Sequence, residues 1–306
     1  MTPGRITSTK APAASPVASG PRGVWLALTY AAAGVMVAIA VGPALWLVLG
    51  AFQPAGGDIG NPIGSLVSGV EVTTDKGDTV TRRLSTANVA EAVEGGRLTR
   101  PLINSVIVTL ARAGLCVVLA ALAAYPLAVM RFPGRRLIFL VILATTMIPE
   151  QVVVVPMFKI TAGLGLFDSL AGAILPFSVS AFGVFLCRQA FLAIPPDLEE
   201  AARIDGAHAG HIWWHVMLPL ASPTLATLAL FSIIGAWSDL LWPLVILQSE
   251  DNFTLPVAIN QMLGLFSTNP RVSYAASVLA LVPIVVVFVA MRRFLKPELL
   301  GGAVKG

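Results

Sequence analysis

Six long apolar stretches separated by shorter polar segments set the pattern of this chain. Each is close to or above the roughly 20 residues that an α-helix needs to cross a lipid bilayer. The alternation over about ten positions that marks the strands of a membrane β-barrel is not found. The pattern predicts an all-α membrane protein with six transmembrane helices, at residues 24–50, 102–130, 137–157, 172–194, 219–248 and 272–291.

Prolines occur within most of these stretches. Proline is tolerated in membrane helices because neighbouring helices and local adjustments satisfy the carbonyl groups that it frees. We therefore keep all six spans, although the second and the fifth are long enough to tilt or bend. The prolines concerned are Pro43, Pro126, Pro176, Pro243 and Pro283.

The composition also indicates a membrane protein. Charged residues make up 12% of the 306 residues, against roughly 25% in ordinary soluble domains, and the mean hydropathy is +0.83. So few charges cannot cover the surface of a soluble protein, which excludes a soluble enzyme, a disordered regulator and a collagen-like chain. Cys116 and Cys187 lie in apolar runs and offer neither a disulfide framework nor the spacing of metal ligands.

Lysine and arginine concentrate on one side of the predicted membrane. If the N-terminus faces the cytoplasm, twelve of the 20 basic residues fall in cytoplasmic segments, and the two short outer loops carry only Lys159 and Arg271. Short cytoplasmic loops carry such an excess, whereas long translocated segments are largely exempt. Both termini are therefore predicted to be cytoplasmic, and the pI near 9.4 reflects membrane topology and not nucleic-acid binding.

Two soluble segments flank the first span. Residues 1–23, rich in Ala, Pro, Ser and Thr, are predicted to be a disordered cytoplasmic tail. A signal peptide is the alternative, but the apolar run that follows is longer than the hydrophobic region of a signal peptide. Residues 51–101 form an extracytoplasmic segment, in which 70–73 and 79–81 are predicted to pair as a β-hairpin with Gly77 available for positive φ.

The segment between the fourth and fifth spans, residues 195–223, has the features of a docking surface. Asp197 lies in the position of an N-cap, and Glu199 and Glu200 follow in the first turn, near the positive end of the helix dipole. A break is expected at Gly206, followed by a second amphipathic piece. Because connecting segments often carry binding functions, we predict that this one docks a partner.

The spacing within this segment resembles the EAA loop of the permeases of binding-protein-dependent ABC importers. Glu200-Ala201-Ala202 is followed after three residues by Gly206, and after nine more by Val216-Met217-Leu218-Pro219. The run at 237–243, Trp-Ser-Asp-Leu-Leu-Trp-Pro, is similar to the carbohydrate branch of these permeases, the maltose type of the second-subunit kind. The tail Gly-Ala-Val-Lys-Gly at 302–306 agrees, and the resemblance extends over residues 85–306.

Some smaller features match the carbohydrate branch of these permeases, and others depart from it. Asn104-Ser105 at the start of the second span matches. Ser238 stands where the family usually has Asn, and the outer segment is longer than is typical, with extra sequence near 63–83. These departures concern the identity of the solute and the docking of the binding protein, and not the family.

The resemblance implies the fold of a type I ABC importer permease, with a transmembrane core at 102–293 and a cytoplasmic tail at 294–306. It implies that the chain moves a sugar or sugar-like solute across the cell membrane into the cytoplasm. Its partners would be a second homologous permease subunit, two ATPase subunits and an extracytoplasmic solute-binding protein. The sequence contains no Gly-x-x-x-x-Gly-Lys-Ser/Thr phosphate loop, so neither catalytic residues nor a cofactor are expected in this chain.

The same resemblance assigns the ATPase contact to the EAA loop. Its helix would lie in a groove of an ATPase subunit, and closure of the ATPase dimer on ATP would open the cavity outward. A carboxylate at a helix start can pair with a partner arginine, small residues allow close approach, and glycine allows the turn. The expected coupling residues are Glu200, Ala201, Ala202, Asp205, Gly206, Leu218 and Pro219.

Other functional classes remain as alternatives. A self-sufficient secondary transporter would usually show an inverted repeat and more acidic groups within the membrane. A membrane enzyme would need a nucleophile with a base, or a set of metal ligands. His208, His211 and His215 have a spacing that would suit zinc, but no fourth ligand lies at a natural distance, and polar residues of a docking surface are the favoured interpretation.

Three charged residues lie deep in the predicted spans: Arg112, Glu150 and Asp239. At 1.5 Å per residue they lie about 10–15 Å below the outer face. An unpaired charge in lipid costs on the order of 3 kcal/mol, so we expect Arg112 to pair with Glu150 or Asp239, leaving the other carboxylate for a sugar hydroxyl. With Trp237 and Trp242 these residues form the candidate solute pathway, and purely structural pairing is the alternative.

Overall fold

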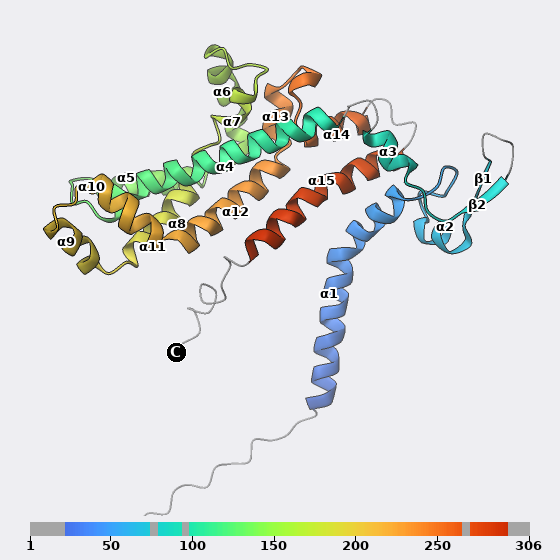
Figure 1. The fold of residues 1–306 in the computed structure, drawn as a ribbon, viewed down its shortest axis with the longest axis horizontal. Helices are drawn as coiled ribbons and strands as arrows, with labels where there is room; N and C mark the ends of the chain where they lie inside the picture. Colours follow the sequence, from blue (N-terminus) through green and yellow to red (C-terminus); the bar gives the residue numbers. More distant parts are fainter. Residues whose placement is uncertain (1–21, 74–78, 94–97, 265–269, 293–306) are drawn as a thin grey trace, which may run out of the picture. The chain divides into compact units, whose positions relative to one another are not determined.

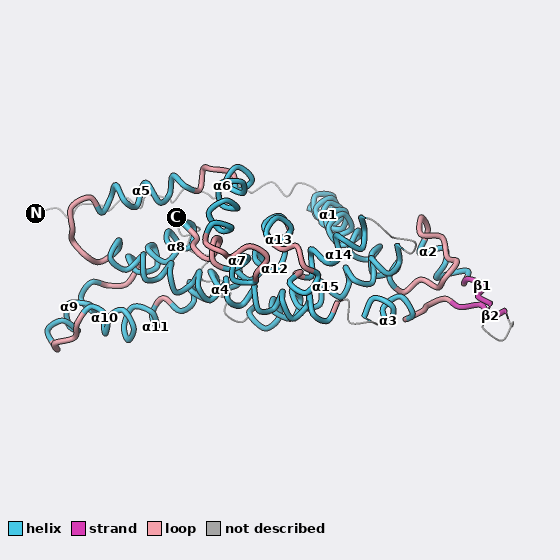
Figure 2. The backbone as a smooth tube through the Cα atoms, turned by 90° about the horizontal axis from the view of Figure 1, so that it is seen from above, coloured by secondary structure: helices cyan, strands magenta, loops and turns pink. Residues whose placement is uncertain are grey.

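The computed structural model describes residues 22–73, 79–93, 98–264 and 270–292. Most of these residues are helical, and one short antiparallel hairpin accompanies the helices (Figure 2). The prediction of an all-α fold is therefore confirmed. The chain divides into two compact units, residues 1–46 and 47–306, and each is described by itself.

The described part of the first unit is a single helical segment, the larger part of α1 (Arg22–Ala51). Trp25, Tyr30 and Met36 are each at least 70% exposed. A helix of this length and apolarity is suited to lipid and not to water, and it matches the first predicted span. The predicted tail at 1–23 lies outside the described residues except for its last two, which are already helical.

The second unit begins with the end of α1 and a small folded segment. This segment contains α2 (Pro62–Ser68), the strands β1 (Val70–Thr73) and β2 (Thr79–Arg82), and α3 (Ala87–Val93). The strands pair antiparallel with Val70 opposite Arg82 and Thr73 opposite Thr79. The predicted hairpin is confirmed, and its second strand is one residue longer than expected. Gly77 lies outside the described residues.

The long helix α4 (Thr99–Ala128) is the centre of the second unit, and α8 (Ala181–Leu192) and α12 (Ser222–Ser238) pack against it (Figure 1). A Cβ added at Gly183 of α8 would lie 3.1 Å from the Cβ of Ala120 and 3.2 Å from Leu228. Small residues let the helices approach closely, as in membrane helix packing generally. Those on the buried face of α4 include Ala113, Cys116, Ala120, Ala121, Ala124 and Ala128.

A second group of helices packs at the start of α4. It consists of α14 (Leu255–Gly264) and α15 (Pro270–Met291), which contact each other, and α15 also contacts α3. Ala275 and Ala276 of α15 are fully buried in this cluster. The helix α15 matches the sixth predicted span, whereas the predicted tail at 294–306 lies outside the described residues.

Three predicted spans are each divided into shorter helices, whereas the sequence analysis expected a bend only in the second and the fifth. Within the described residues, three helices are long and apolar enough to cross a membrane alone, or up to five if each bent pair forms one span. The number of crossings therefore stays a prediction. The pieces of the divided spans are α5 (Arg135–Thr145) with α6 (Glu150–Gly163), α7 (Leu170–Ile174) with α8, and α11 (Leu218–Leu220) with α12 and α13 (Leu241–Ile246).

The breaks have local causes. Pro149, which lacks a backbone N–H, precedes the first residue of α6, and the axes of α5 and α6 differ by 100°. Pro176 lies in the gap between α7 and α8. Asp239 ends α12 in an extended conformation with ψ 115°. Hydropathy alone does not reveal these breaks, because the chain stays apolar on both sides of each one.

Candidate functional site

The helix α9 (Pro196–Ile204) forms the first part of the EAA-like loop. Its first residue is proline, which has no N–H to leave unpaired and has a φ suited to a first turn. Acidic residues lie in the first turn and Arg203 in the last, as the helix dipole favours. The Arg203 Nε donates to the Glu199 carboxylate at 2.9 Å. The helix lies at the end of α4 that is away from α3 (Figure 1).

Gly206 makes the sharp turn after this helix. Its φ is +82°, a left-handed conformation that side chains other than glycine rarely adopt. The backbone N–H of Ala207 donates to the Ala202 carbonyl at 3.0 Å, which closes the helix end. No atom lies within 4 Å of a Cβ added at Gly206. The backbone conformation, and not lack of space, therefore demands glycine here.

The two faces of α9 differ sharply. Glu200 and Ala201 are exposed, whereas Ala202 is partly buried against the chain's own core. The apolar side chains of Leu198 and Ile204 are also exposed, by 45% and 86%. The sequence analysis did not name Leu198 and Ile204, although their spacing from Ala201, three residues on either side, places all three near one face.

The rest of the loop returns to the core. His208 accepts from the His211 N–H and caps α10 (Ala209–Ile212), which continues through a π-helical turn into α11. Ile212 and Met217 are buried in the cluster formed with the end of α4. The Trp213 indole N–H donates to the Ala121 carbonyl of α4 at 3.3 Å. Packing and this hydrogen bond therefore hold the second half of the loop against α4.

The last two predicted coupling residues and the histidines lie in this second half of the loop. Leu218 packs against the same cluster, and Pro219 is exposed. The rings of His211 and His215 stack with centroids 4.0 Å apart. Among the described residues no group of three or more His, Cys, Asp or Glu side chains is placed to hold a metal, so the zinc alternative finds no support.

Two of the three deep charges meet. The Arg112 Nη1 donates to the Asp239 Oδ2 at 2.6 Å, and both side chains are only 11% exposed. The guanidinium also lies 5.6 Å from the centre of the Phe177 ring. Glu150, at the start of α6, is exposed. Of the two partners predicted for Arg112, the structure selects Asp239.

The position of Asp239 follows from the break in its helix. It ends α12, and its Oδ1 accepts from the backbone N–H of Trp242 at 3.3 Å, in the first turn of α13. A short acceptor side chain can satisfy the open N–H groups at a helix start. One oxygen of the Asp239 carboxylate thus caps the start of α13, and the other oxygen pairs with Arg112.

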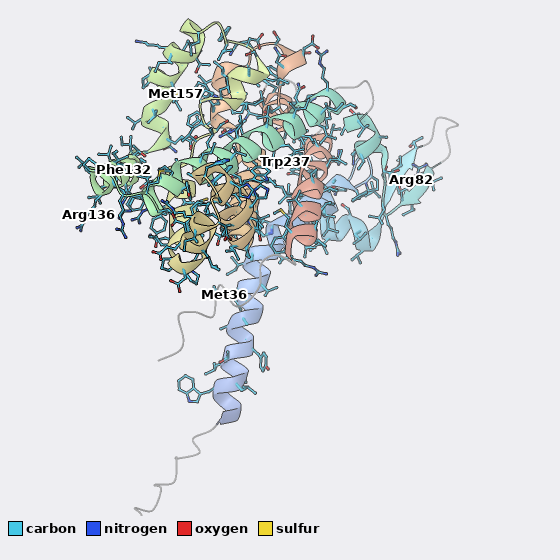
Figure 3. The ribbon with its side chains drawn as sticks, turned by 60° about the vertical axis from the view of Figure 1, so that its left-hand side comes forward. Met36, Arg82, Phe132, Arg136, Met157 and Trp237 are labelled. Carbon is cyan, nitrogen blue, oxygen red and sulfur yellow. The ribbon has the colours of Figure 1, made fainter. Side chains whose placement is uncertain are left out.

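The two tryptophans near this break are buried and bonded within the chain. The Trp242 indole N–H donates to the Gly172 carbonyl at 3.0 Å, and its side chain is 0% exposed. The Trp237 indole N–H donates to the Ala280 carbonyl of α15 at 3.0 Å, and Figure 3 shows Trp237 among the helices. Both have packing roles in this structure, and contact with a solute stays a prediction for them.

A cavity of about 210 Å³ opens beside the Arg112–Asp239 pair. Arg112 and Cys116 line it from α4, one turn apart, and residues of α12 and of the segment around α8 complete the wall. The sequence analysis identified Arg112 but not the rest of the wall. The lining residues of α12 recur every three to four positions, so a helical spacing in the sequence could have indicated that they share one face. The other lining residues are Phe177, Ser180, Phe182, Leu228, Phe231, Ser232, Gly235 and Ala236.

A comparison with protein-family models matches residues 116–301 to the binding-protein-dependent transport system inner membrane component family. The match covers the cavity wall from Cys116 onward, the EAA-like loop and α15. The chain belongs to this family. It is thus a membrane component of a transport system and not an enzyme, as the sequence analysis predicted.

Relatives of this permease carry names for different solutes. An arabinooligosaccharides transport system permease protein, AraQ of Bacillus subtilis, is 36% identical over 203 residues, 66% of this chain and 72% of its own. An sn-glycerol-3-phosphate transport system permease protein, UgpE of Agrobacterium fabrum, is 36% identical over 217 residues, 68% of this chain and 77% of its own. The identities are equal, so similarity alone does not choose between these solutes.

A solved structure shares the fold of this permease. It is the crystal structure of a bacterial ABC transporter involved in the import of the acidic polysaccharide alginate. One of its chains superposes with a TM-score of 0.77 and 23% sequence identity, over 92% of the present chain and all of the other. The permease fold predicted from the EAA-like loop is therefore confirmed.

The permease also carries a polar network at the start of α4. Asn104 donates its amide to the carbonyls of Asp251 and Phe253, at 2.9 and 3.0 Å, and the Ser105 hydroxyl accepts from the Leu255 N–H at 2.7 Å. The pair Asn104-Ser105, which the sequence analysis matched to the family, therefore fastens the segment that leads into α14.

Asp168 fastens the same segment from the loop between α6 and α7. Its φ is +51°, and its carboxylate accepts from the Ser249 hydroxyl and from the backbone N–H groups of Gln248 and Ser249. Asn252 donates to the Asp168 carbonyl at 2.7 Å. Hydrogen bonds, first of all from the Ser249 hydroxyl, hold the pKa of Asp168 well below its ordinary value.

Proposed function

We propose that this permease is one membrane subunit of an ATP-driven importer that moves a sugar or sugar-like solute into the cytoplasm. Relatives named for arabinooligosaccharides and for sn-glycerol-3-phosphate support a solute rich in hydroxyl groups. The observation that carries the proposal is the exposed helix α9 with its Gly206 turn, fastened to the helix that lines the cavity.

The helix α9 transmits the conformational change that ATP binding causes in the ATPase subunits to the permease. Its exposed apolar residues Leu198 and Ile204 bury in a groove of an ATPase subunit, and Ala201 lies close to the groove wall. Glu200, exposed near the start of the helix, pairs with an arginine of the ATPase, a charge-assisted contact. Asp205 and Gly206 shape the turn. Leu218 and Pro219 connect the loop to α12.

The solute passes beside the Arg112–Asp239 pair. The cavity there, about 210 Å³, is smaller than the roughly 300–1,000 Å³ of most small-molecule sites. A second, homologous permease subunit facing it would complete the enclosure. Glu150 is exposed in this chain and is a candidate contact nearer the mouth, and Trp237 and Trp242 support the wall.

The complete transporter contains a second permease, two ATPase subunits and an extracytoplasmic binding protein. The dependence on a binding protein follows from the family description. The helix α5 buries none of its residues within the chain, and its apolar side chains Leu137, Ile138, Leu140 and Val141 are exposed. Such a surface needs lipid or a second membrane subunit to cover it.

The test of the coupling role is ATP-dependent uptake in membrane vesicles that carry the complete transporter and its binding protein. Changing Ile204 to Glu should reduce uptake by about tenfold or more, because a buried interface position receives an unpaired charge. The ATPase subunits should also separate from the permease on purification. The matched variant Ile204→Leu keeps an apolar side chain and should retain both uptake and association.

Two results would contradict the proposal. Normal uptake by the Ile204→Glu transporter would remove α9 from the coupling interface. Uptake by this chain alone, driven by an ion gradient without ATP, would replace the importer with a secondary transporter.

A further inference from the structure

We propose that the Arg112–Asp239 pair makes the cavity selective for solutes without net charge and excludes phosphorylated or acidic ones. The inference rests on the proposed function, since it concerns the solute of the same cavity. It goes further because the family includes relatives named for an uncharged class of sugar and for a phosphate ester, and the family alone leaves the charge of this solute open.

The charge of the cavity wall is set by one pair. Among the described residues that line the cavity, Arg112 is the one with a charged side chain, and Asp239 lies behind it without lining the wall itself. The other lining residues are glycine or have aromatic, aliphatic, hydroxyl or thiol side chains. An unpaired guanidinium in such a place would attract an anion strongly, because the surroundings screen charge poorly. Asp239 lies 2.6 Å from it and is equally buried. The pair is neutral overall, so the cavity offers no excess positive charge to a phosphate or carboxylate.

The same pair leaves polar groups for a neutral solute. A guanidinium has five N–H donors, and among the described residues its side-chain hydrogen bond is the one to Asp239 through Nη1. The hydroxyl groups of Ser180 and Ser232 also line the cavity. Phenyl rings, two of which meet edge to face at 6.3 Å, provide apolar surface for the C–H face of a sugar ring. Donors, hydroxyls and ring faces without net charge suit an uncharged polyol or sugar.

A native thiol reports on the charge of this cavity. Cys116 lines it one turn from Arg112 and is 4% exposed, and the Ser232 hydroxyl donates to its sulfur at 3.3 Å. The other cysteine, Cys187, belongs to the same buried cluster as Cys116 but does not line the cavity. It is 0% exposed and can be changed to Ser. Two methanethiosulfonate reagents of similar size, one with a sulfonate and one with a trimethylammonium group, then probe the cavity with opposite charges. The ratio of their rates cancels any change in the thiolate fraction of Cys116.

The experiment labels Cys116 in membranes that carry the complete transporter and follows the modified peptide by mass spectrometry. With the native pair, the ratio of anionic to cationic reagent rates should stay within about threefold of the ratio for a free thiol in the same buffer. Changing Asp239 to Asn leaves Arg112 unbalanced and should raise the ratio by about tenfold or more. Changing Arg112 to Met should lower it by a similar factor.

Two controls keep the result interpretable. The variant Asp251→Asn removes an exposed carboxylate that pairs with Arg100 at 2.7 Å, outside the cavity wall, and should leave the ratio unchanged. The double variant Arg112→Met with Asp239→Asn removes both charges and should also keep the native ratio. It provides the comparison if either single variant fails to fold.

Three results would overturn the inference. One is a native ratio that favours the anionic reagent by about tenfold or more, and another is a ratio that Asp239→Asn does not change. The third is absence of labelling by both reagents at Cys116 and also in a Ser232→Cys variant, whose position lines the cavity and is partly exposed, because the cavity would then be closed to molecules of solute size. Uptake is measured separately in the same vesicles. If the ratio favours the anionic reagent while ATP-dependent uptake is normal, the inference is contradicted and the proposed function is not. If the ratio matches that of a free thiol but ATP-dependent uptake is absent, the proposed function is contradicted and the inference is not.

Discussion

Gly206 is a residue at which the backbone alone demands glycine. With φ at +82° and open space around a would-be Cβ, alanine would meet no clash but would hold an unfavourable conformation that costs about 1–2 kcal/mol. We expect Gly206→Ala to reduce binding-protein-stimulated ATP hydrolysis several-fold while the chain still inserts into the membrane. The measurement is stimulated hydrolysis by the reconstituted transporter.

Two variants of the same loop separate this effect from a general loss of the loop. Asn adopts left-handed conformations more readily than Ala, so Gly206→Asn should retain more activity than Gly206→Ala. Gly210 lies in a helix without positive φ, and a Cβ there would lie 3.4 Å from the His208 ring, so Gly210→Ala should be nearly neutral. Equal loss in all three variants would show that the conformation of Gly206 is not the cause.

Asp168 is a residue whose ionisation stabilises two loops at once. Its folded pKa is lowered, so its contribution is fully present above the unfolded value of about 4. It is lost as the pH falls from there toward the folded pKa. We expect Asp168→Asn to increase proteolysis of the loops 164–169 and 247–252 at pH 7. The difference from the native chain should be constant down to about pH 4 and shrink below it. A difference that grows as the pH falls would contradict this assignment.

At the scale of secondary-structure elements, the β1–β2 hairpin is the distinctive feature of the segment before α4. It lies in the segment near 63–83 that the sequence analysis predicts to be longer than is typical of the family, and Arg82, labelled in Figure 3, belongs to it. Glu71 and Arg82 face water, and the hairpin packs in neither of the two large helix clusters. We expect that replacing 70–82 by a short Gly-Ser linker lowers the apparent affinity of the transporter for its binding protein. Basal ATP hydrolysis should stay unchanged.

The measurement for that prediction is a titration of ATP hydrolysis with the binding protein. A several-fold rise in the concentration for half-maximal stimulation supports docking on the hairpin. An unchanged titration curve would identify the segment as a neutral insertion.

Prolines show which elements the sequence can and cannot predict. Pro43, Pro126 and Pro283 lie inside the continuous helices α1, α4 and α15, as the sequence analysis assumed. Pro176, in contrast, lies in a gap between two helices. Proline itself does not decide whether a helix continues, because the surroundings determine whether the carbonyl groups that it frees find other hydrogen-bond partners. Continuous spans were therefore predictable from hydropathy, whereas the presence of a proline did not by itself show whether a helix would break there.

At the scale of the second unit, α4 connects the two parts of the site. Arg112 and Cys116 line the cavity, and Ala121, which accepts from Trp213 of the loop, follows Arg112 by nine residues, about 14 Å along the helix. Spacing in the sequence was sufficient to find the loop, because its motif is local. The cavity wall could not be predicted in the same way, because it joins residues of α4, α8 and α12, which are more than 40 positions apart in the sequence.

The last prediction tests whether the buried pair also holds the unit together. Breaking a buried ion pair by removing one partner costs about 3–5 kcal/mol, because the other charge stays buried and uncompensated. Arg112→Met and Asp239→Asn should each lower the unfolding temperature of the purified complex, whereas the double variant should recover most of the loss. Glu150→Gln is the matched control, since Glu150 is exposed and surface changes are usually within about 0.5 kcal/mol. If the two single losses simply add in the double variant, the residues are independent, and the contact between Arg112 and Asp239 contributes nothing to stability.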